Sequence, residues 1–321
     1  MGNITFIILT IIAVILGINL ISFILKKLLS RNELDGIKPL GKLVKVNGRK
    51  MHVHSMGNGE KTIVLLPGLG IPLPSVDFAP LMRELSKKYT VVCVEFFGYG
   101  FSDQTDTPRT NKNYTEEIRQ ALAGAGFKPP YILMPYSASG IYCEYYATKY
   151  PQEVEGLILL DTTSSAEKEA SIPGFVIKIT KFQRAIGIMR FLNPLILPKA
   201  TGITKNNGYS EQEIKEILKF ANHAGNDTID NQLMEHHATI LEVMDMEFPK
   251  EVPVLMLSAD GYKKGKWEKY RANHLKKLGE HAKYKVIEGS NHSNIYHDMS
   301  YRKVVCETVS DFVEKEGKKT T

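Results

Sequence analysis

A serine and a histidine stand where this chain could perform nucleophilic chemistry. Ser137 lies in the turn PYSASG (135–140), between an apolar run and a helical pattern. Small residues around a serine let the backbone fold tightly enough to expose its hydroxyl. A serine hydroxyl is unreactive near neutral pH and needs an adjacent base to accept its proton. His292 directly follows the last apolar strand pattern, in GSNH (289–292), so we expect it to be that base.

Each of these assignments has a rival of the same residue type. Ser139 is the second hydroxyl of the turn, and a structural serine at a helix N-cap is the alternative to a nucleophile. His297 comes five residues after His292 and is expected on the following helix, so we favour His292. We interpret the histidines at 223, 236, 237, 274 and 281 as surface residues.

The elements that must position Ser137 and His292 alternate between strands and helices. A hairpin is predicted at 42–46 and 50–55 around Asn47-Gly48, a strong turn signal. Apolar strands are then predicted at 62–66, 90–95, 131–134, 157–160, 254–257 and 284–287, with helices at 78–88, 115–125 and 141–150. The alternation predicts an α/β fold with a doubly wound, mostly parallel sheet covered by helices on both faces.

The segment from about 164 to 248 interrupts this alternation. It shows no clear strand pattern and contains several helical segments separated by proline and glycine. A structureless loop of this length is uncommon in a compact domain. We therefore interpret it as a helical cap insertion over the carboxyl edge of the sheet, where such folds place their sites. Its apolar stretches 175–179 and 186–197 either pack on the core, line an apolar acyl pocket or rest on a bilayer.

The segment PYSASGIYCEYYATKYPQEVEGLILLD (135–161) resembles the nucleophile elbow, helix and following strand of the α/β-hydrolase family. The resemblance covers roughly residues 47–313. It implies a catalytic triad in the chain order serine, acid, histidine. The usual elbow is G-x-S-x-G, and this chain carries Pro135 and Ser139 in place of the two glycines. Ser139 is small enough for the turn, whereas Pro135 fixes its own φ near −65°.

The family resemblance leaves two candidates for the acid that orients the histidine. Most members place it a few residues beyond the strand here written VPVLML, and Asp260 stands there, about two residues earlier than the common spacing. A minority branch, similar to some haloalkane dehalogenases and lipases, uses an acid after the preceding strand. Asp161 occupies that position, 24 residues beyond Ser137. We place Asp161 slightly ahead and keep Asp260 as the alternative.

The oxyanion hole is expected to consist of backbone N–H groups, which need no reorganisation as charge develops. By resemblance, Ala138 supplies one, and Leu69, in PGLG (67–70), supplies the other. The family often has His-Gly where this chain has Pro67-Gly68. Gly68 keeps the turn that the loop requires.

Residues 4–25 form an apolar segment without a charged side chain over 22 positions. As a helix the segment would rise about 33 Å, enough to cross a hydrocarbon core about 30 Å thick. It therefore predicts a single-pass transmembrane anchor. Basic residues follow it and none precedes it, which favours a cytoplasmic body. We divide the chain into an anchor and linker at 1–41 and an α/β-hydrolase domain at 42–321.

Composition bounds the remaining possibilities. The chain is 43% hydrophobic with a net charge of +6, which is typical of a globular protein and gives no indication of nucleic-acid binding. Its cysteines are three and far apart, at 93, 143 and 306, which favours neither a disulfide framework nor a zinc site. We expect no metal and no cofactor.

Two functional hypotheses follow. In the first, the chain is a membrane-anchored serine hydrolase that cleaves a small-molecule or lipid ester through an acyl-enzyme. In the second, it is a non-catalytic binding or scaffold protein on the same fold at the membrane, as the altered elbow glycines and the ambiguous acid would suggest. A separation of Ser137 and His292 beyond hydrogen-bonding reach would favour the second hypothesis.

Overall fold

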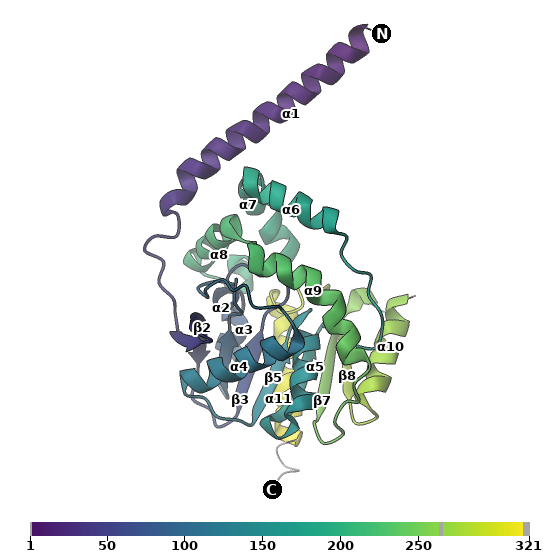
Figure 1. Cartoon of the computed structure of the whole chain (residues 1–321). Helices are drawn as coiled ribbons and strands as arrows, with labels where there is room; N and C mark the ends of the chain where they lie inside the picture. Colours follow the sequence, from purple (N-terminus) through teal and green to yellow (C-terminus); the bar gives the residue numbers. More distant parts are fainter. Residues whose placement is uncertain (1, 263–265, 317–321) are drawn as a thin grey trace.

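A single eight-stranded sheet forms the centre of the molecule (Figure 1). The computed structural model describes residues 2–262 and 266–316. The strand order is β1-β2-β4-β3-β5-β6-β7-β8. β2 pairs antiparallel with both β1 and β4, and all the other neighbouring pairs are parallel. The strands are β1 Lys42–Val46, β2 Arg49–Met56, β3 Thr62–Leu66, β4 Thr90–Val94, β5 Tyr131–Pro135, β6 Val154–Leu160, β7 Val254–Ala259 and β8 Lys283–Ile287. The predicted mostly parallel α/β sheet is thus confirmed.

Helices cover both faces because the strand side chains are apolar on both sides. One face packs against α4 (Asn111–Ala125) and α5 (Ser139–Lys149), where Tyr114, Ile118 and Tyr142 are buried. The other face packs against α3 (Ala79–Leu85) and α11 (Met299–Glu316). The sheet is therefore a fixed platform whose parallel strands all end at one edge.

Four helices occupy the segment expected to form a cap. They are α6 Gly174–Ile186, α7 Met189–Thr201, α8 Glu211–His223 and α9 Asp227–Met244. Ser210 and Glu213 form a reciprocal capping box at the start of α8, and the side chain of Asn226 caps α9. These caps fix where the two helices begin.

Some helix boundaries differ from the expectation. The helix expected at 78–88 is two short helices, α2 (Pro74–Asp77) and α3. The helix expected at 115–125 begins at Asn111, because the hydroxyl of Thr110 accepts the N–H of Asn113 and caps it there. An additional helix, α10 (Lys266–Leu278), follows β7.

The amino-terminal segment is the helix α1 (Gly2–Leu29), which contains the predicted anchor 4–25. Within the described residues, no helix meets the length and hydropathy that a membrane crossing requires. The predicted transmembrane anchor, and the single-pass placement that depended on it, are therefore not supported. The structure shows α1 joined to the cap instead: Ser22 donates to the carbonyl of Ile186 at 2.7 Å, and Lys26 donates to that of Arg184 at 2.6 Å.

Candidate active site

Ser137 stands in a strained turn between β5 and α5. Its φ is 57°, in the left-handed region that non-glycine residues seldom adopt. The turn is held by backbone hydrogen bonds, in which Ser137 N–H donates to the carbonyl of Leu160 and Gly140 N–H to that of Ser137. Such strain at the end of a parallel strand projects the hydroxyl away from the sheet edge.

Ser139, the rival hydroxyl, is fully buried and structural. Its Oγ lies 2.9 Å from the carbonyl oxygens of both Leu66 and Tyr136, which share its one proton, and it accepts the N–H of Tyr136 at 3.1 Å. The side chain that replaces the family's second glycine therefore fastens the elbow to β3.

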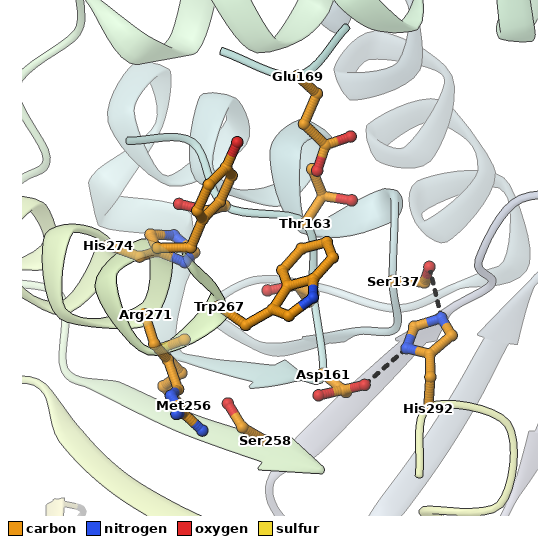
Figure 2. Close-up of a pocket in the computed structure, with 13 residues that line it drawn as sticks. Ser137, Asp161, Thr163, Glu169, Met256, Ser258, Trp267, Arg271, His274 and His292 are labelled. Atoms are coloured by element: carbon orange, nitrogen blue, oxygen red, sulfur yellow. Dashed lines mark hydrogen bonds and ion pairs between the residues drawn. The ribbon is translucent and has the colours of Figure 1, made fainter. Parts of the chain in front are cut away.

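Three side chains from different strand ends form one hydrogen-bonded chain (Figure 2). His292 Nε2 lies 3.1 Å from Ser137 Oγ, and His292 Nδ1 lies 2.6 Å from Asp161 Oδ2. Asp161 is itself held, because its Oδ1 accepts the N–H of Ala259 at 2.8 Å. The carboxylate is buried while the imidazole is partly exposed, at 3% and 39% of the side-chain surface. The arrangement can orient an imidazole, stabilise its charged form and remove the serine proton.

Asp260, the alternative acid, has a different position. Its Oδ2 accepts the N–H of Gly289 at 2.8 Å, and its own N–H donates to the carbonyl of Ser290. It thus supports the loop that carries His292, and it is Asp161 that contacts the imidazole.

Ala138 and Leu69, the two residues expected to supply the oxyanion hole, lie in the turn of Ser137 and in the loop that closely approaches it. Ala138 begins the turn of α5, and Leu69 lies in the loop after β3 that lines the same hollow as Ser137. Among the hydrogen bonds of the described residues, neither the Leu69 nor the Ala138 N–H donates to a protein group. An oxyanion hole formed by these two N–H groups stays a prediction.

Gly68 is required by the close approach of this loop to the elbow. A Cβ at Gly68 would lie 2.8 Å from Ser137 Cβ and 2.9 Å from Tyr136 Cδ1. The replacement Gly68→Ala should push the Leu69 N–H away from Ser137 and lower kcat by about a hundredfold. Gly174→Ala, where no atom lies within 4 Å of the added carbon, is the matched control. Comparable kcat values for the two variants in an ester assay would contradict the assignment of Leu69.

Tyr136 is a site residue that the sequence analysis missed. Its ring stacks on the His292 ring, with centroids 4.9 Å apart and planes 19° apart, and its hydroxyl donates to the His292 carbonyl at 2.6 Å. The only sequence signal was its position directly before the serine. Tyr136 thus restrains the imidazole by stacking on one face of its ring and by binding its backbone carbonyl.

The replacement Tyr136→Phe tests this restraint. It keeps the stacked ring and removes one hydrogen bond, worth about 1 kcal/mol, so kcat should fall about fivefold with KM nearly unchanged. Tyr136→Ala, which also removes the ring, should cost clearly more. Equal kcat in wild type and both variants, measured at one pH in an ester assay, would show that His292 needs no such support.

The rival histidine His297 is engaged elsewhere, in the turn before α11 rather than on the helix. It is buried, and its Nε2 lies 3.0 Å from Asp77 Oδ1. The same carboxylate oxygen accepts the hydroxyl of Tyr296 at 2.5 Å. Burial raises the pKa of Tyr296 well above its ordinary value, so this hydroxyl stays protonated and continues to donate.

His274 was interpreted as a surface residue, and this is wrong. It is fully buried, and its Nε2 lies 2.8 Å from Glu144 Oε1, an equally buried carboxylate that also accepts the hydroxyl of Ser165. Sequence spacing could not show this, because Glu144 lies on α5 and His274 on α10.

Two hollows meet at Ser137 and His292. One, of about 190 Å³, extends past Asp161 toward Trp267 and His274 (Figure 2). The other, of about 210 Å³, lies on the Leu69 side and is covered by apolar side chains of the cap, namely Leu197, Ile203 and Ile217. The described residues contain no cluster of three or more His, Cys, Asp or Glu that could hold a metal ion.

Comparisons with known proteins agree with this architecture. The family model described as "alpha/beta hydrolase fold" matches residues 61–180. A Bacillus subtilis protein, "Uncharacterized protein YbdG", is 30% identical over 258 residues, which cover 77% of each chain. The mouse serine hydrolase BPHL is 30% identical over 132 residues, 40% of this chain and 45% of that protein. The chain belongs to the α/β-hydrolase family, and it is a hydrolase of that family.

Solved structures show the same fold. An esterase from Exiguobacterium antarcticum aligns with a TM-score of 0.60 at 17% identity, covering 85% of this chain and 99% of that one. An epoxide hydrolase from Vigna radiata aligns with a TM-score of 0.61 at 16% identity, covering 85% and 97%. At these identities the likeness concerns the fold alone, and the reaction must be argued from the site.

Proposed function

We propose that this chain is a serine hydrolase that cleaves ester-like substrates through an acyl-enzyme. The observation that carries the proposal is the continuous hydrogen-bonded chain from Ser137 Oγ through His292 to Asp161, with separations of 3.1 and 2.6 Å. Nucleophile and base within such reach, with the base oriented by a third group, are the geometry of nucleophilic catalysis.

The proposed reaction has two halves. As Ser137 Oγ attacks the substrate carbonyl carbon, His292 Nε2 takes the hydroxyl proton, and the N–H groups of Leu69 and Ala138 bind the oxyanion. Collapse of the tetrahedral intermediate breaks the ester bond, and His292 returns the proton to the leaving alkoxide. His292 then deprotonates a water that attacks the acyl-enzyme carbonyl; as the bond to Ser137 Oγ breaks and the acid leaves, His292 returns that proton to Ser137 Oγ. In both halves Asp161 stabilises the imidazolium.

The hollow beneath the cap favours an apolar acyl portion. Leu197, Ile203 and Ile217 cover it, and Leu69 and Ile71 line its floor. Apolar side chains such as these bind a hydrocarbon chain by removing it from water. We therefore expect p-nitrophenyl esters of medium acyl length to give a higher kcat/KM than the acetate.

An ester series tests the proposal. Wild-type protein should release p-nitrophenol from acyl esters, and Ser137→Ala protein should not. The second hypothesis, a binding protein without catalysis, predicts no turnover by either protein and saturable binding of the same esters. The hydrogen-bonding distance between Ser137 and His292 weighs against it.

A further inference from the structure

The outer side of the cap exposes an unusual number of large apolar side chains. In α6, Phe175, Ile179 and Phe182 recur at helical spacing along one face, with 63%, 49% and 59% of their surface exposed. Exposed apolar residues of α7 continue this surface. We call the whole set the outer cap face: Phe175, Ile179, Phe182, Met189, Phe191, Leu192, Leu195 and Ile196. Many exposed large apolar side chains on two consecutive helices indicate an interaction site.

The charge of this region indicates the partner. Residues 171–202 contain no Asp or Glu. Their basic residues are Lys178, Lys181, Arg184, Arg190 and Lys199. Three of these pair with acidic residues of neighbouring segments, and the exposed Lys178 and Lys199 add positive charge beside the apolar face. Helices with an apolar face of Phe and Leu and flanking lysines are typical of the interface of an anionic membrane.

The surroundings of the outer cap face fit the same partner. α1 contacts the end of α6 through its carboxyl-terminal part, and its amino-terminal part extends away from the body of the molecule (Figure 1). α1 also exposes large apolar side chains in the part that contacts α6, among them Leu20, Phe23 and Leu28. α7 also has an inner side, where Leu197 and Thr201 line the hollow that leads to Ser137. One helix thus separates the outer cap face from the candidate active site.

We propose that the outer cap face docks peripherally on an anionic lipid bilayer, with α6 and α7 lying in the headgroup region. No helix has to cross the bilayer for this contact. If the proposed function also holds, a lipophilic ester can pass from the bilayer around α7 to Ser137. The docking itself does not depend on catalysis.

The test places an environment-sensitive nitrobenzoxadiazole group on the full-length chain at Leu195→Cys, in the outer cap face. The matched control is Asp311→Cys, an exposed position on α11. Both variants carry Cys306→Ala; Cys93 and Cys143 are fully buried, and burial raises their thiol pKa well above the ordinary value, so they escape labelling. Emission is recorded with phosphatidylcholine vesicles with and without phosphatidylglycerol, and with doxyl-labelled lipid as quencher.

We expect a blue shift at Leu195→Cys with phosphatidylglycerol vesicles. Doxyl-labelled lipid should quench the probe at Leu195→Cys at least about threefold more than the probe at Asp311→Cys, because an interfacial helix lies about 5–10 Å deep in the bilayer. If the protein bound to the vesicles in a flotation assay but the probe at Leu195→Cys still emitted as it does in water, the proposal would be overturned. A shift that needs no vesicles and rises with protein concentration would assign the face to a second copy instead. Adding Ser137→Ala should leave the result unchanged, so a failure of the proposed reaction is distinguishable.

Discussion

Replacing Asp161 by asparagine should lower kcat by about 10³–10⁴-fold while leaving the fold intact. The amide oxygen of Asn can still accept the N–H of Ala259, which Asp161 Oδ1 accepts at 2.8 Å. The amide NH₂ then faces His292 Nδ1 and donates to it. This selects the tautomer with the proton on Nε2, which cannot accept the proton of Ser137. Because asparagine tolerates the positive φ of 47° at this position, the loss should lie in catalysis rather than in stability.

Asp260→Asn is the matched control for this prediction. Its Oδ2 accepts the N–H of Gly289, and an amide oxygen can accept the same N–H there. We expect kcat within about threefold of wild type. Steady-state kinetics on one ester, with thermal unfolding measured in parallel, separate the two variants. If Asp260→Asn lost more activity than Asp161→Asn, the acid would have to be reassigned.

Replacing His292 by alanine should lower kcat by about 10⁴-fold or more, since it removes the group that accepts and returns the proton. His292 is partly exposed, so the loss of its side chain should affect stability little. The rest of the site, with Leu69, Ala138 and Ser137, remains in place to give a small residual rate.

Replacing His297 by glutamine should affect stability rather than catalysis, the reverse of His292→Ala. This residue is buried against Asp77 and has no contact with Ser137 among the described interactions, so its replacement should lower the melting temperature and leave kcat within about fivefold of wild type. Kinetics and calorimetry on the two variants distinguish them. A fall in kcat for His297→Gln as large as that for His292→Ala would contradict the choice of base.

The sequence predicted the strands well because each is a short apolar run with clear boundaries. β3, for example, is Thr62–Leu66 as expected, and the hairpin turns at Asn47-Gly48. Ser137 and His292 could be proposed because each follows such a strand, and parallel strands end at one edge. These are local patterns, and local patterns are what a single sequence shows.

Contacts between distant segments could not be predicted in the same way. Asp161 and Asp260 both follow strands, and only their side-chain directions decide which meets His292. His274 resembles a surface residue until α10 brings it against Glu144. The hydropathy of residues 4–25 indicated a membrane crossing but not the contact of α1 with the cap, because pattern does not specify packing partners.

The central claim is that Ser137 is an activated nucleophile, and labelling with a fluorophosphonate tests it most directly. The account predicts one adduct on the full-length wild-type protein, mapped by mass spectrometry to Ser137. Labelling should disappear in Ser137→Ala and remain in Ser139→Ala, because the Ser139 hydroxyl is buried and bonded to Leu66. A folded wild-type protein that stays unlabelled, or an adduct that persists in Ser137→Ala, would contradict the account.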